Sequence, residues 1–340
     1  MGGPTSAGLI AVAHTDMPWL LQQARLRLEL GGMITLDSVR AVQRVADLGL
    51  TDSPGALAGY SGGGMASAWA AALAPSCAPE LDLAAVVAGG VPADLEQMAE
   101  RLGFNPHPGF GLAFAAAIGL EREYLHRFPV SAQLNEPGLW LRDWMFNECR
   151  RFLLFHVAFR SAGQLAETTT LWTSATAHQV LRENSLRYFR DIPTAPLYLG
   201  HGTLDGLTPY GSVAEVAHRC CAAGARLTFV PYEISEHMTT AVVGFPDAYE
   251  YVAARLRGEA APPPAADAPV RRRGRPASAS NSTPTGTEQS PHEPRIDLRA
   301  REMTSVQPAR GRAESLSHFR SREPLLPQVP GGSPGIPRGR

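Results

Sequence analysis

Few backbone arrangements accommodate residues 59–63, whose sequence is GYSGG. A short apolar run precedes this turn at residues 56–58, and good helix formers follow it at residues 64–73. A serine between a strand and a helix, with glycines two residues away on both sides, is typical of a nucleophile elbow. Small residues are needed because the serine is strained and the helix packs back onto the strand. We therefore predict that Ser61 is a nucleophile; a chance occurrence in a chain rich in Gly, Ala and Ser is the alternative.

A serine reacts at neutral pH only with a base beside it and a carboxylate that orients the base. In hydrolases built on such an elbow, the acid and then the histidine follow the serine along the chain, each after a strand. A buried strand is predicted at residues 195–199, and Asp205 follows it on a glycine-rich loop. The next predicted strand, residues 226–230, is followed by His237. The spacing therefore predicts a triad of Ser61, Asp205 and His237.

Each of these assignments has a competitor. Asp205 precedes a glycine, a common turn pair, so an ordinary turn residue is the alternative to a catalytic role. His201 is the rival histidine; it precedes the acid, and we expect it to shape the acid's loop. Glu233 and Glu236 are the alternative orienting carboxylates. The other histidines lie in no matching context and are interpreted as surface or core residues: His14, His107, His126, His156, His178 and His218.

Predicted strands and helices alternate along the chain. A buried strand is expected at residues 8–13, an amphipathic helix at residues 30–48, and another strand at residues 83–87. Such alternation is typical of a mostly parallel sheet with helices on both faces. A last amphipathic helix is expected to begin at His237. Its apolar positions are Met238, Ala241, Val242, Tyr249, Val252 and Leu256.

Residues 92–193 are far longer than a crossover between parallel strands needs. Their pattern is largely helical, and they are rich in apolar and aromatic residues. One interpretation is a helical insertion with a small core of its own. A compatible functional interpretation adds that the insertion is a lid whose apolar inner face lines an acyl pocket.

Taken together, these motifs resemble the secretory lipase family of yeasts and actinobacteria, the lipase A-type branch of the α/β-hydrolases. The supporting motifs lie at residues 59–63, 73–75, 78–81, 89–92 and 201–210. The resemblance implies an α/β-hydrolase fold with a helical lid, acting without a cofactor on carboxylic esters with long or bulky acyl chains. It also implies triad roles for Ser61, Asp205 and His237. The N–H of Gly62, at the head of the elbow helix, is then half of the oxyanion hole.

The composition changes sharply near Gly258. Residues 259–340 are full of Pro, Arg, Ser and Gly, so they bury too little apolar surface to offset their ordering entropy, and we predict a disordered tail. The predicted division is residues 1–91 for the first part of the hydrolase core, 92–193 for the lid insertion, 194–258 for the rest of the core and 259–340 for the tail.

Charge and cysteine content bear on partners and metals. Residues 271–276 resemble the core of an AT-hook, but a solvated basic tail is the preferred interpretation, and the formal net charge of −1 argues against nucleic acid as the main partner. No apolar stretch is long enough to span a membrane. Because no cysteine pair has C-x-x-C spacing, no metal site is expected; the disulfide state and the oligomeric state stay open. The cysteines are Cys77, Cys149, Cys220 and Cys221.

The family pattern is incomplete near the N-terminus. In this fold the second oxyanion donor follows the third strand, whereas residues 8–13 match the family's fourth strand. We therefore expect a truncated gene model, a fragment or a degenerate member with compromised catalysis, and a strand at residues 8–13 without its usual neighbour. Residues 1–6 lack the features of a signal peptide. Secretion or a cell-envelope location is thus implied by the resemblance, and a cytoplasmic location is expected if the start is genuine.

These inferences predict a lipase or carboxylic ester hydrolase of the triacylglycerol lipase type, acting through an acyl-enzyme on Ser61. His237 takes the serine proton and returns it to the leaving alcohol, while Asp205 holds the histidine tautomer. One alternative is an esterase or acyltransferase with a different acyl substrate. The other is a non-catalytic hydrolase-fold protein that cannot form the oxyanion hole.

Overall fold

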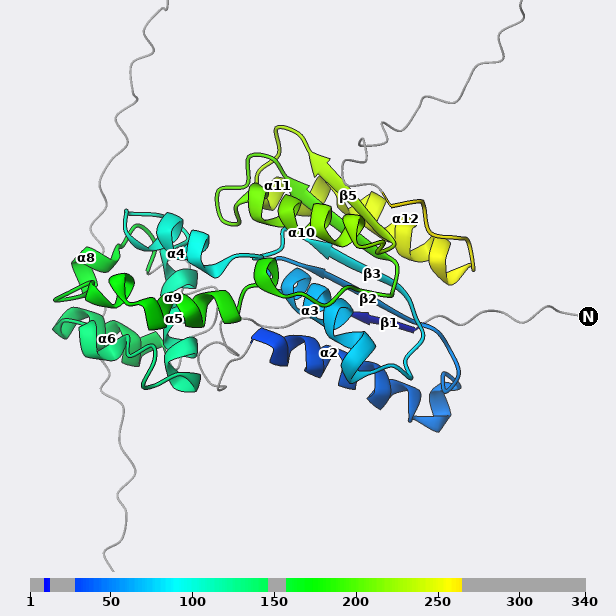
Figure 1. The fold of residues 1–340 in the computed structure, drawn as a ribbon, viewed down its shortest axis with the longest axis horizontal. Helices are drawn as coiled ribbons and strands as arrows, with labels where there is room; N and C mark the ends of the chain where they lie inside the picture. The colour runs from blue at the N-terminus through cyan, green and yellow to red at the C-terminus, as the bar shows by residue number, and fades with distance from the viewer. Residues whose placement is uncertain (1–8, 13–27, 146–156, 265–340) are drawn as a thin grey trace, which may run out of the picture. The chain divides into compact units, whose positions relative to one another are not determined.

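A parallel sheet organises the computed structural model, which describes residues 9–12, 28–145 and 157–264. Within these residues the sheet has the strand order β1-β2-β3-β4-β5, and each strand pairs in parallel with the next (Figure 1). The carboxyl ends of all strands therefore meet at one edge. The bounds are β1 Leu9–Val12, β2 Gly55–Tyr60, β3 Leu83–Gly89, β4 Leu197–Gly202 and β5 Leu227–Tyr232. The predicted parallel sheet flanked by helices is confirmed.

One face of the sheet carries the larger core. Its strand residues include Leu57, Val86, Leu199 and Phe229, and Trp69 packs there with none of its surface exposed. The strands alternate their side chains between two buried faces, which explains why their sequences are almost continuously apolar. Among the described helices, this face is covered by α2 Leu28–Gln43, α3 Gly62–Cys77 and α10 Tyr210–Ala222. The helix expected at residues 30–48 ends earlier, and a short 3₁₀ helix, η1 Ala46–Leu48, follows it.

The opposite face has a smaller core that is rich in tyrosine. Tyr198 and Tyr232 of the sheet pack with Tyr251 and Val252 of the last helix. Two helices lie at this face, α11 His237–Val243 and α12 Phe245–Leu256. The prediction of one continuous last helix is therefore wrong. The break falls just before Pro246, which starts a helix well but cannot continue one.

The predicted apolar stripe of that last helix is also only partly buried. Val252 lies in the core, but Met238, Val242 and Tyr249 are 66%, 73% and 60% exposed. Because the helix is broken, one regular periodicity does not describe both halves. A second correction concerns β4, which begins and ends later than the strand predicted at residues 195–199, so that His201 is a strand residue.

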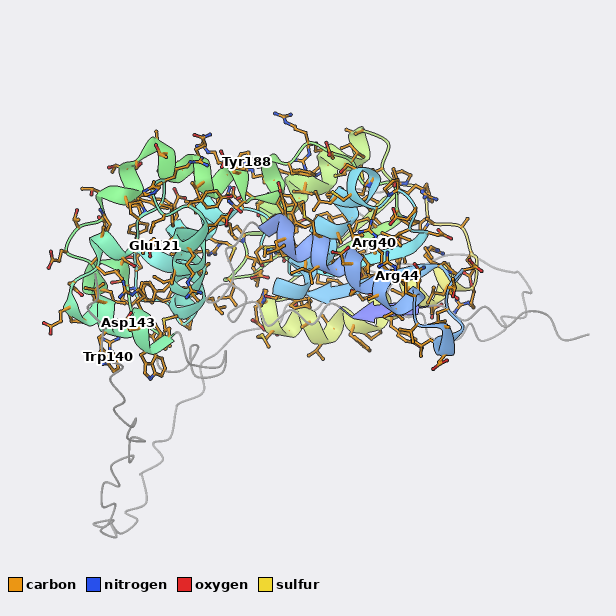
Figure 2. The ribbon with its side chains drawn as sticks, turned by 90° about the horizontal axis from the view of Figure 1, so that it is seen from below. Arg40, Arg44, Glu121, Trp140, Asp143 and Tyr188 are labelled. Carbon is orange, nitrogen blue, oxygen red and sulfur yellow. The ribbon has the colours of Figure 1, made fainter. Side chains whose placement is uncertain are left out.

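Helices occupy the stretch between β3 and β4, and Figure 1 shows α4, α5, α6, α8 and α9 gathered together. Arg187, in the 3₁₀ helix just before β4, joins this stretch to α10 by an ion pair with Glu215. Arg187 also pairs with Asp94 at 2.7 Å. Trp140 of α6 is exposed (Figure 2). The bounds are α4 Leu95–Gly103, α5 Phe110–Glu123, η2 Ser131–Gln133, α6 Glu136–Met145, α8 Ala162–Leu165, η3 Thr170–Thr173, α9 Ala175–Glu183 and η4 Leu186–Tyr188.

Several sequence predictions fall outside the described residues. They concern the tail beyond residue 264, including the AT-hook-like stretch, as well as His14, His156 and Cys149. Residues 259–264 are described and lie in no helix or strand. β1 has β2 as its neighbour, with Leu9 opposite Gly55. In the part of the chain that the structure describes, no helix combines the length and apolar character needed to cross a membrane.

Candidate active site

Ser61 occupies a tight turn between β2 and α3. Its φ is 55° and its ψ is −118°, a conformation that non-glycine residues rarely adopt. A side chain at Gly59 would overlap the carbonyl of Gly63, so the strand and the helix approach each other as a nucleophile elbow requires. The Ser61 N–H donates to the carbonyl of Gly89 at 2.8 Å, which ties the turn to β3.

Asp205 is buried on the loop after β4 and is held by that loop. Its Oδ1 accepts hydrogen bonds from the N–H groups of Leu207 at 2.9 Å and Thr208 at 2.8 Å. The Thr208 hydroxyl donates to Oδ2 at 2.8 Å. These bonds come from the loop itself, so they orient the carboxylate independently of contacts with other elements.

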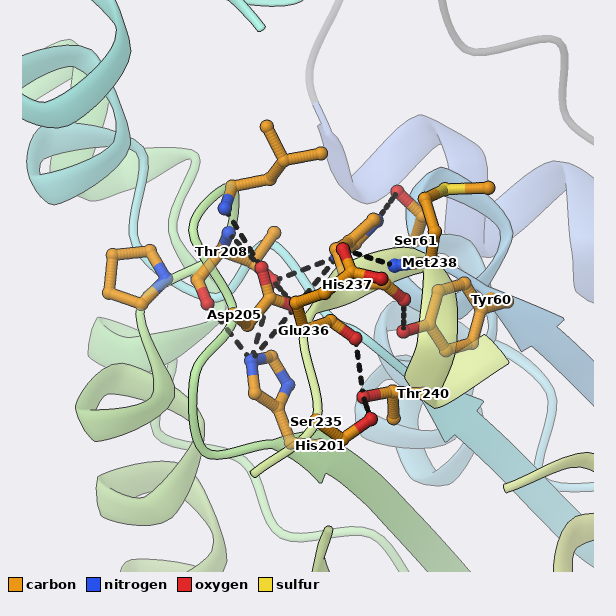
Figure 3. A network of polar contacts seen from close by, with 12 residues as sticks. Tyr60, Ser61, His201, Asp205, Thr208, Ser235, Glu236, His237, Met238 and Thr240 are labelled. Carbon is orange, nitrogen blue, oxygen red and sulfur yellow. Dashed lines mark hydrogen bonds and ion pairs between the residues drawn. The ribbon is translucent and has the colours of Figure 1, made fainter. Parts of the chain in front are cut away.

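His237 joins the acid to the serine. Its Nδ1 lies 2.7 Å from Asp205 Oδ2, and its Nε2 lies 3.0 Å from Ser61 Oγ (Figure 3). A carboxylate only accepts hydrogen bonds, so Nδ1 carries the proton and the Nε2 lone pair faces the serine hydroxyl. His237 is the first residue of α11, and Glu236 caps that helix by accepting from the N–H groups of Met238 and Thr239. Three segments far apart in sequence thus meet at one edge of the sheet.

The competing residues lie elsewhere or hold other positions. His201 is fully buried on β4, with its Nε2 3.0 Å from the carbonyl of Thr208 and 3.6 Å from Asp205 Oδ2. It contacts the acid's loop, as expected. Glu236 is used as a helix cap and Glu233 is exposed. His178, in the helical stretch, contacts Glu96 at 2.6 Å.

Burial and hydrogen bonding set the charges of the site. Burial alone would raise the pKa of Asp205, but hydrogen bonds and charge from His237, together with the hydrogen bonds from Thr208, outweigh it and hold that pKa below its ordinary value. Burial lowers the pKa of His201, which is therefore neutral near pH 7. The acid stays ionised, and His201 adds no positive charge beside it.

Gly62 is the first residue of α3, beside the candidate nucleophile. The first N–H groups of a helix have no acceptor within the helix and lie at the positive end of its dipole. They are suited to stabilise an anion that forms next to Ser61. Among the described residues, no group of three or more His, Cys, Asp or Glu side chains is arranged to hold a metal.

The helices between β3 and β4 line a partly open apolar cavity of about 150 Å³. Its lining includes Phe104, Phe110, Phe114, Phe128, Leu171 and Trp172. A side chain at Gly109, just before α5, would lie 2.7 Å from Leu207 Cδ2. The start of the helix that lines the cavity therefore lies against the loop that holds Asp205.

Sequence reasoning missed the roles of two residues that organise this site. Thr208 holds the acid with both its N–H and its hydroxyl; the signal for it was its place three residues after an aspartate, the spacing of a local side-chain turn. Tyr60 contacts the backbone of His237, and no sequence signal indicates that contact.

A parallel sheet flanked by helices, with a serine at a strand–helix turn and an acid and a histidine after later strands, defines an α/β hydrolase. The chain belongs to the secretory lipase family, whose model matches residues 29–263. This confirms the family inferred from the sequence motifs.

Individual relatives are similar over the same part of the chain. Lipase A of Moesziomyces aphidis is 31% identical over 220 residues, which are 63% of this chain and 47% of that protein. The secreted triacylglycerol lipase LIP3 of Malassezia restricta is 28% identical over 237 residues, or 68% and 50% of the two chains. The crystal structure of Candida antarctica lipase A superposes with a TM-score of 0.65 at 28% identity, covering 71% of this chain and 57% of that one. The chain thus spans about half the length of the curated relatives it matches.

Proposed function

We propose that this chain carries the catalytic residues of a lipase, a serine ester hydrolase that acts on carboxylic esters of lipids. The observation that carries the proposal is the hydrogen-bonded series from Asp205 through His237 to Ser61, with distances of 2.7 and 3.0 Å. Membership of the secretory lipase family supports the same chemistry. No cofactor takes part in the proposed reaction.

The proposed reaction follows from the positions of these groups. Ser61 Oγ attacks the ester carbonyl carbon while its proton moves to His237 Nε2. The N–H of Gly62 stabilises the resulting oxyanion. The imidazolium then gives its proton to the leaving alcohol, and an acyl ester remains on Ser61. Water, deprotonated by His237, releases the acid and restores the serine, while Asp205 stays ionised throughout.

We infer that the cavity between β3 and β4 receives the acyl chain. Its lining is almost wholly apolar, and α5, which contributes Phe110 and Phe114, begins against the loop of Asp205. Residues 92–193 then form the lid insertion, between hydrolase-core segments at residues 1–91 and 194–258. Because relatives with lipase names are described as secreted, we extend secretion to this protein as part of the proposal.

Covalent labelling tests the proposal. A fluorophosphonate reacts only with an activated serine, so the chain should be labelled on the peptide that contains Ser61. The variant Ser61→Ala should not be labelled, and circular dichroism should show that it is folded. A folded wild-type chain that is not labelled would indicate a non-catalytic hydrolase-fold protein. A series of p-nitrophenyl esters then separates a lipase, which prefers longer acyl chains, from an esterase that prefers acetate.

A further inference from the structure

Tyr60 links the strand that carries the nucleophile to the helix that carries the base. It is the last residue of β2, directly before Ser61. Its hydroxyl donates to the backbone carbonyl of His237 at 2.5 Å (Figure 3). The rings of Tyr60 and His237 lie against each other, with centroids 5.2 Å apart and planes tilted by 56°.

Two glycines at the end of β3 make room for the Tyr60 ring. A Cβ at Gly89 would lie 2.6 Å from the ring, and a Cβ at Gly90 would lie 2.7 Å from it. Gly90 also has a positive φ of 54°, which favours glycine. Gly89 is the residue whose carbonyl accepts from the Ser61 N–H. The backbone that holds the serine therefore also seats the tyrosine.

The residues just before His237 are held by other bonds: the Leu204 N–H donates to the carbonyl of Ser235 at 3.1 Å, and the Thr240 hydroxyl donates to the carbonyl of Glu236 at 2.7 Å. His237 begins a helix of seven residues, and it follows Ile234, which has a positive φ and a largely exposed side chain. The bonds from Asp205 and Ser61 reach only its imidazole. The Tyr60 hydroxyl, in contrast, holds its main chain. A displacement of about 1 Å at such a position is enough to lower a rate by a factor of about 100.

We propose that Tyr60 is a positioning residue, whose hydroxyl fixes the backbone of His237 so that Nε2 is directed at Ser61 Oγ. This inference rests on the proposed function and adds a residue that touches neither the ester nor the transferred proton. Burial raises the pKa of Tyr60 far above its ordinary value, so its hydroxyl remains a donor at any pH where the enzyme would work.

A matched pair of variants tests this inference. Tyr60→Phe removes the hydroxyl that contacts His237. Tyr198→Phe removes a buried hydroxyl on the same face of the sheet, which forms a hydrogen bond with the hydroxyl of Tyr232 at 2.6 Å. Both variants lose one hydrogen bond of a tyrosine hydroxyl, so we expect similar small falls of melting temperature.

The kinetic results should differ between the two variants. For Tyr60→Phe we expect the fluorophosphonate labelling rate, and kcat for p-nitrophenyl butyrate per titrated active site, to fall about 10- to 100-fold with KM nearly unchanged. For Tyr198→Phe both rates should stay near those of the wild type. Equal rates for Tyr60→Phe and the wild type, or equal slowing in both variants, would overturn the inference.

Two further outcomes separate this inference from the proposed function. An unlabelled wild-type chain would overturn the proposed function, and this inference with it. A labelled wild type with an equally fast Tyr60→Phe variant would overturn the inference alone. If Tyr60→Phe does not fold, 4-fluorophenylalanine at position 60 keeps the ring and fills the place of the hydroxyl but cannot donate to the His237 carbonyl. A labelling rate equal to that of the wild type would then overturn the inference.

Discussion

In the sheet and the loops attached to it, buried polar groups carry the candidate chemistry, whereas the helices between β3 and β4 line a partly open apolar cavity. Asp205 and His237 are buried and bonded to each other, and each is also held by its own loop or helix cap. In the helical stretch the ion pair of Arg127 with Glu183 is exposed, whereas Arg187 pairs with the buried carboxylate of Asp94. The cavity lining itself is almost free of polar surface.

The difference teaches how each region acquires a function. Parallel strands bring their carboxyl ends to one edge, so backbone pairing alone gathers residues as distant as Ser61 and His237. Backbone pairing does not determine where a cavity lies between helices. Its volume is what remains after side chains from several helices have packed, and one methylene more or less changes it. Changes in the sheet region should therefore alter rate, and changes in the helical region should alter substrate preference.

The largest expected effect is the loss of ester hydrolysis when a triad residue of the sheet region is replaced, and it distinguishes His237 from His201. Ser61→Ala and His237→Ala should each lower ester hydrolysis by about four to six orders of magnitude, because the triad acts as a unit. Asp205→Ala should cost less, since the acid transfers no proton. His201→Ala should cost far less than His237→Ala, because His201 contacts only the acid and its loop. The measurement is kcat/KM for p-nitrophenyl butyrate on variants that circular dichroism shows to be folded.

Two results would contradict this assignment. One is retention of more than about one per cent of activity by Ser61→Ala, which a cooperating triad does not allow. The other is a larger loss for His201→Ala than for His237→Ala, which would make His201 the base.

A smaller effect is expected from filling the cavity. Ala117→Phe places a ring among the lining residues and should lower kcat/KM for a long-chain p-nitrophenyl ester about 10- to 100-fold, while the acetate ester is hydrolysed as before. Leu125→Phe is the control, because Leu125 is exposed and does not line the cavity. An equal loss for both esters would show that the cavity does not receive the acyl chain.

Acid stability offers a comparison of the two regions within one measurement. The pKa of Asp205 is lowered for the reasons given above. The pKa of Glu96, on α4, is also lowered, chiefly by its hydrogen bond from Arg182 and further by His178, although burial acts in the opposite direction. A carboxylate with a lowered pKa in the folded state stabilises the fold above its unfolded pKa, near 4, and this stabilisation is lost as the pH falls through the folded value.

Urea unfolding between about pH 6 and pH 3 should therefore show falling stability in the wild type. Asp205→Asn should flatten this dependence more than Glu96→Gln, because Arg182 is exposed and its ion pair is screened by solvent. The opposite ranking would mean that the helical stretch, rather than the sheet region, holds the more strongly stabilised carboxylate.

The smallest effect is expected outside both regions. Deletion of residues 265–340 should leave turnover unchanged and shift the melting temperature by less than about 5 °C, because their composition lacks the apolar periodicity of a packed element. Differential scanning calorimetry of the full and shortened chains measures this. A larger shift would show that the tail packs on one of the two regions.

Much of the sheet region could be predicted because its signals are local. An apolar run, a small-residue turn and helix formers identify the environment of Ser61, and the same strand-then-loop pattern identifies Asp205 and His237. The predictions for the last helix were wrong where they relied on one continuous periodicity across Gly244 and Pro246. The helical stretch was predicted as helical and apolar, and no pattern within it indicates which side chains would surround a cavity.

The sequence by itself determined where the strands lie along the chain, the strained turn at Ser61 and which polar residues follow each strand, because short-range sterics and apolar periodicity act within a few neighbouring residues. The tertiary structure alone decided that Met238 and Val242 are exposed and that the hydroxyl of Tyr60 meets the backbone of His237. These features depend on contacts between elements far apart along the chain, and such contacts exist only after the sheet has assembled.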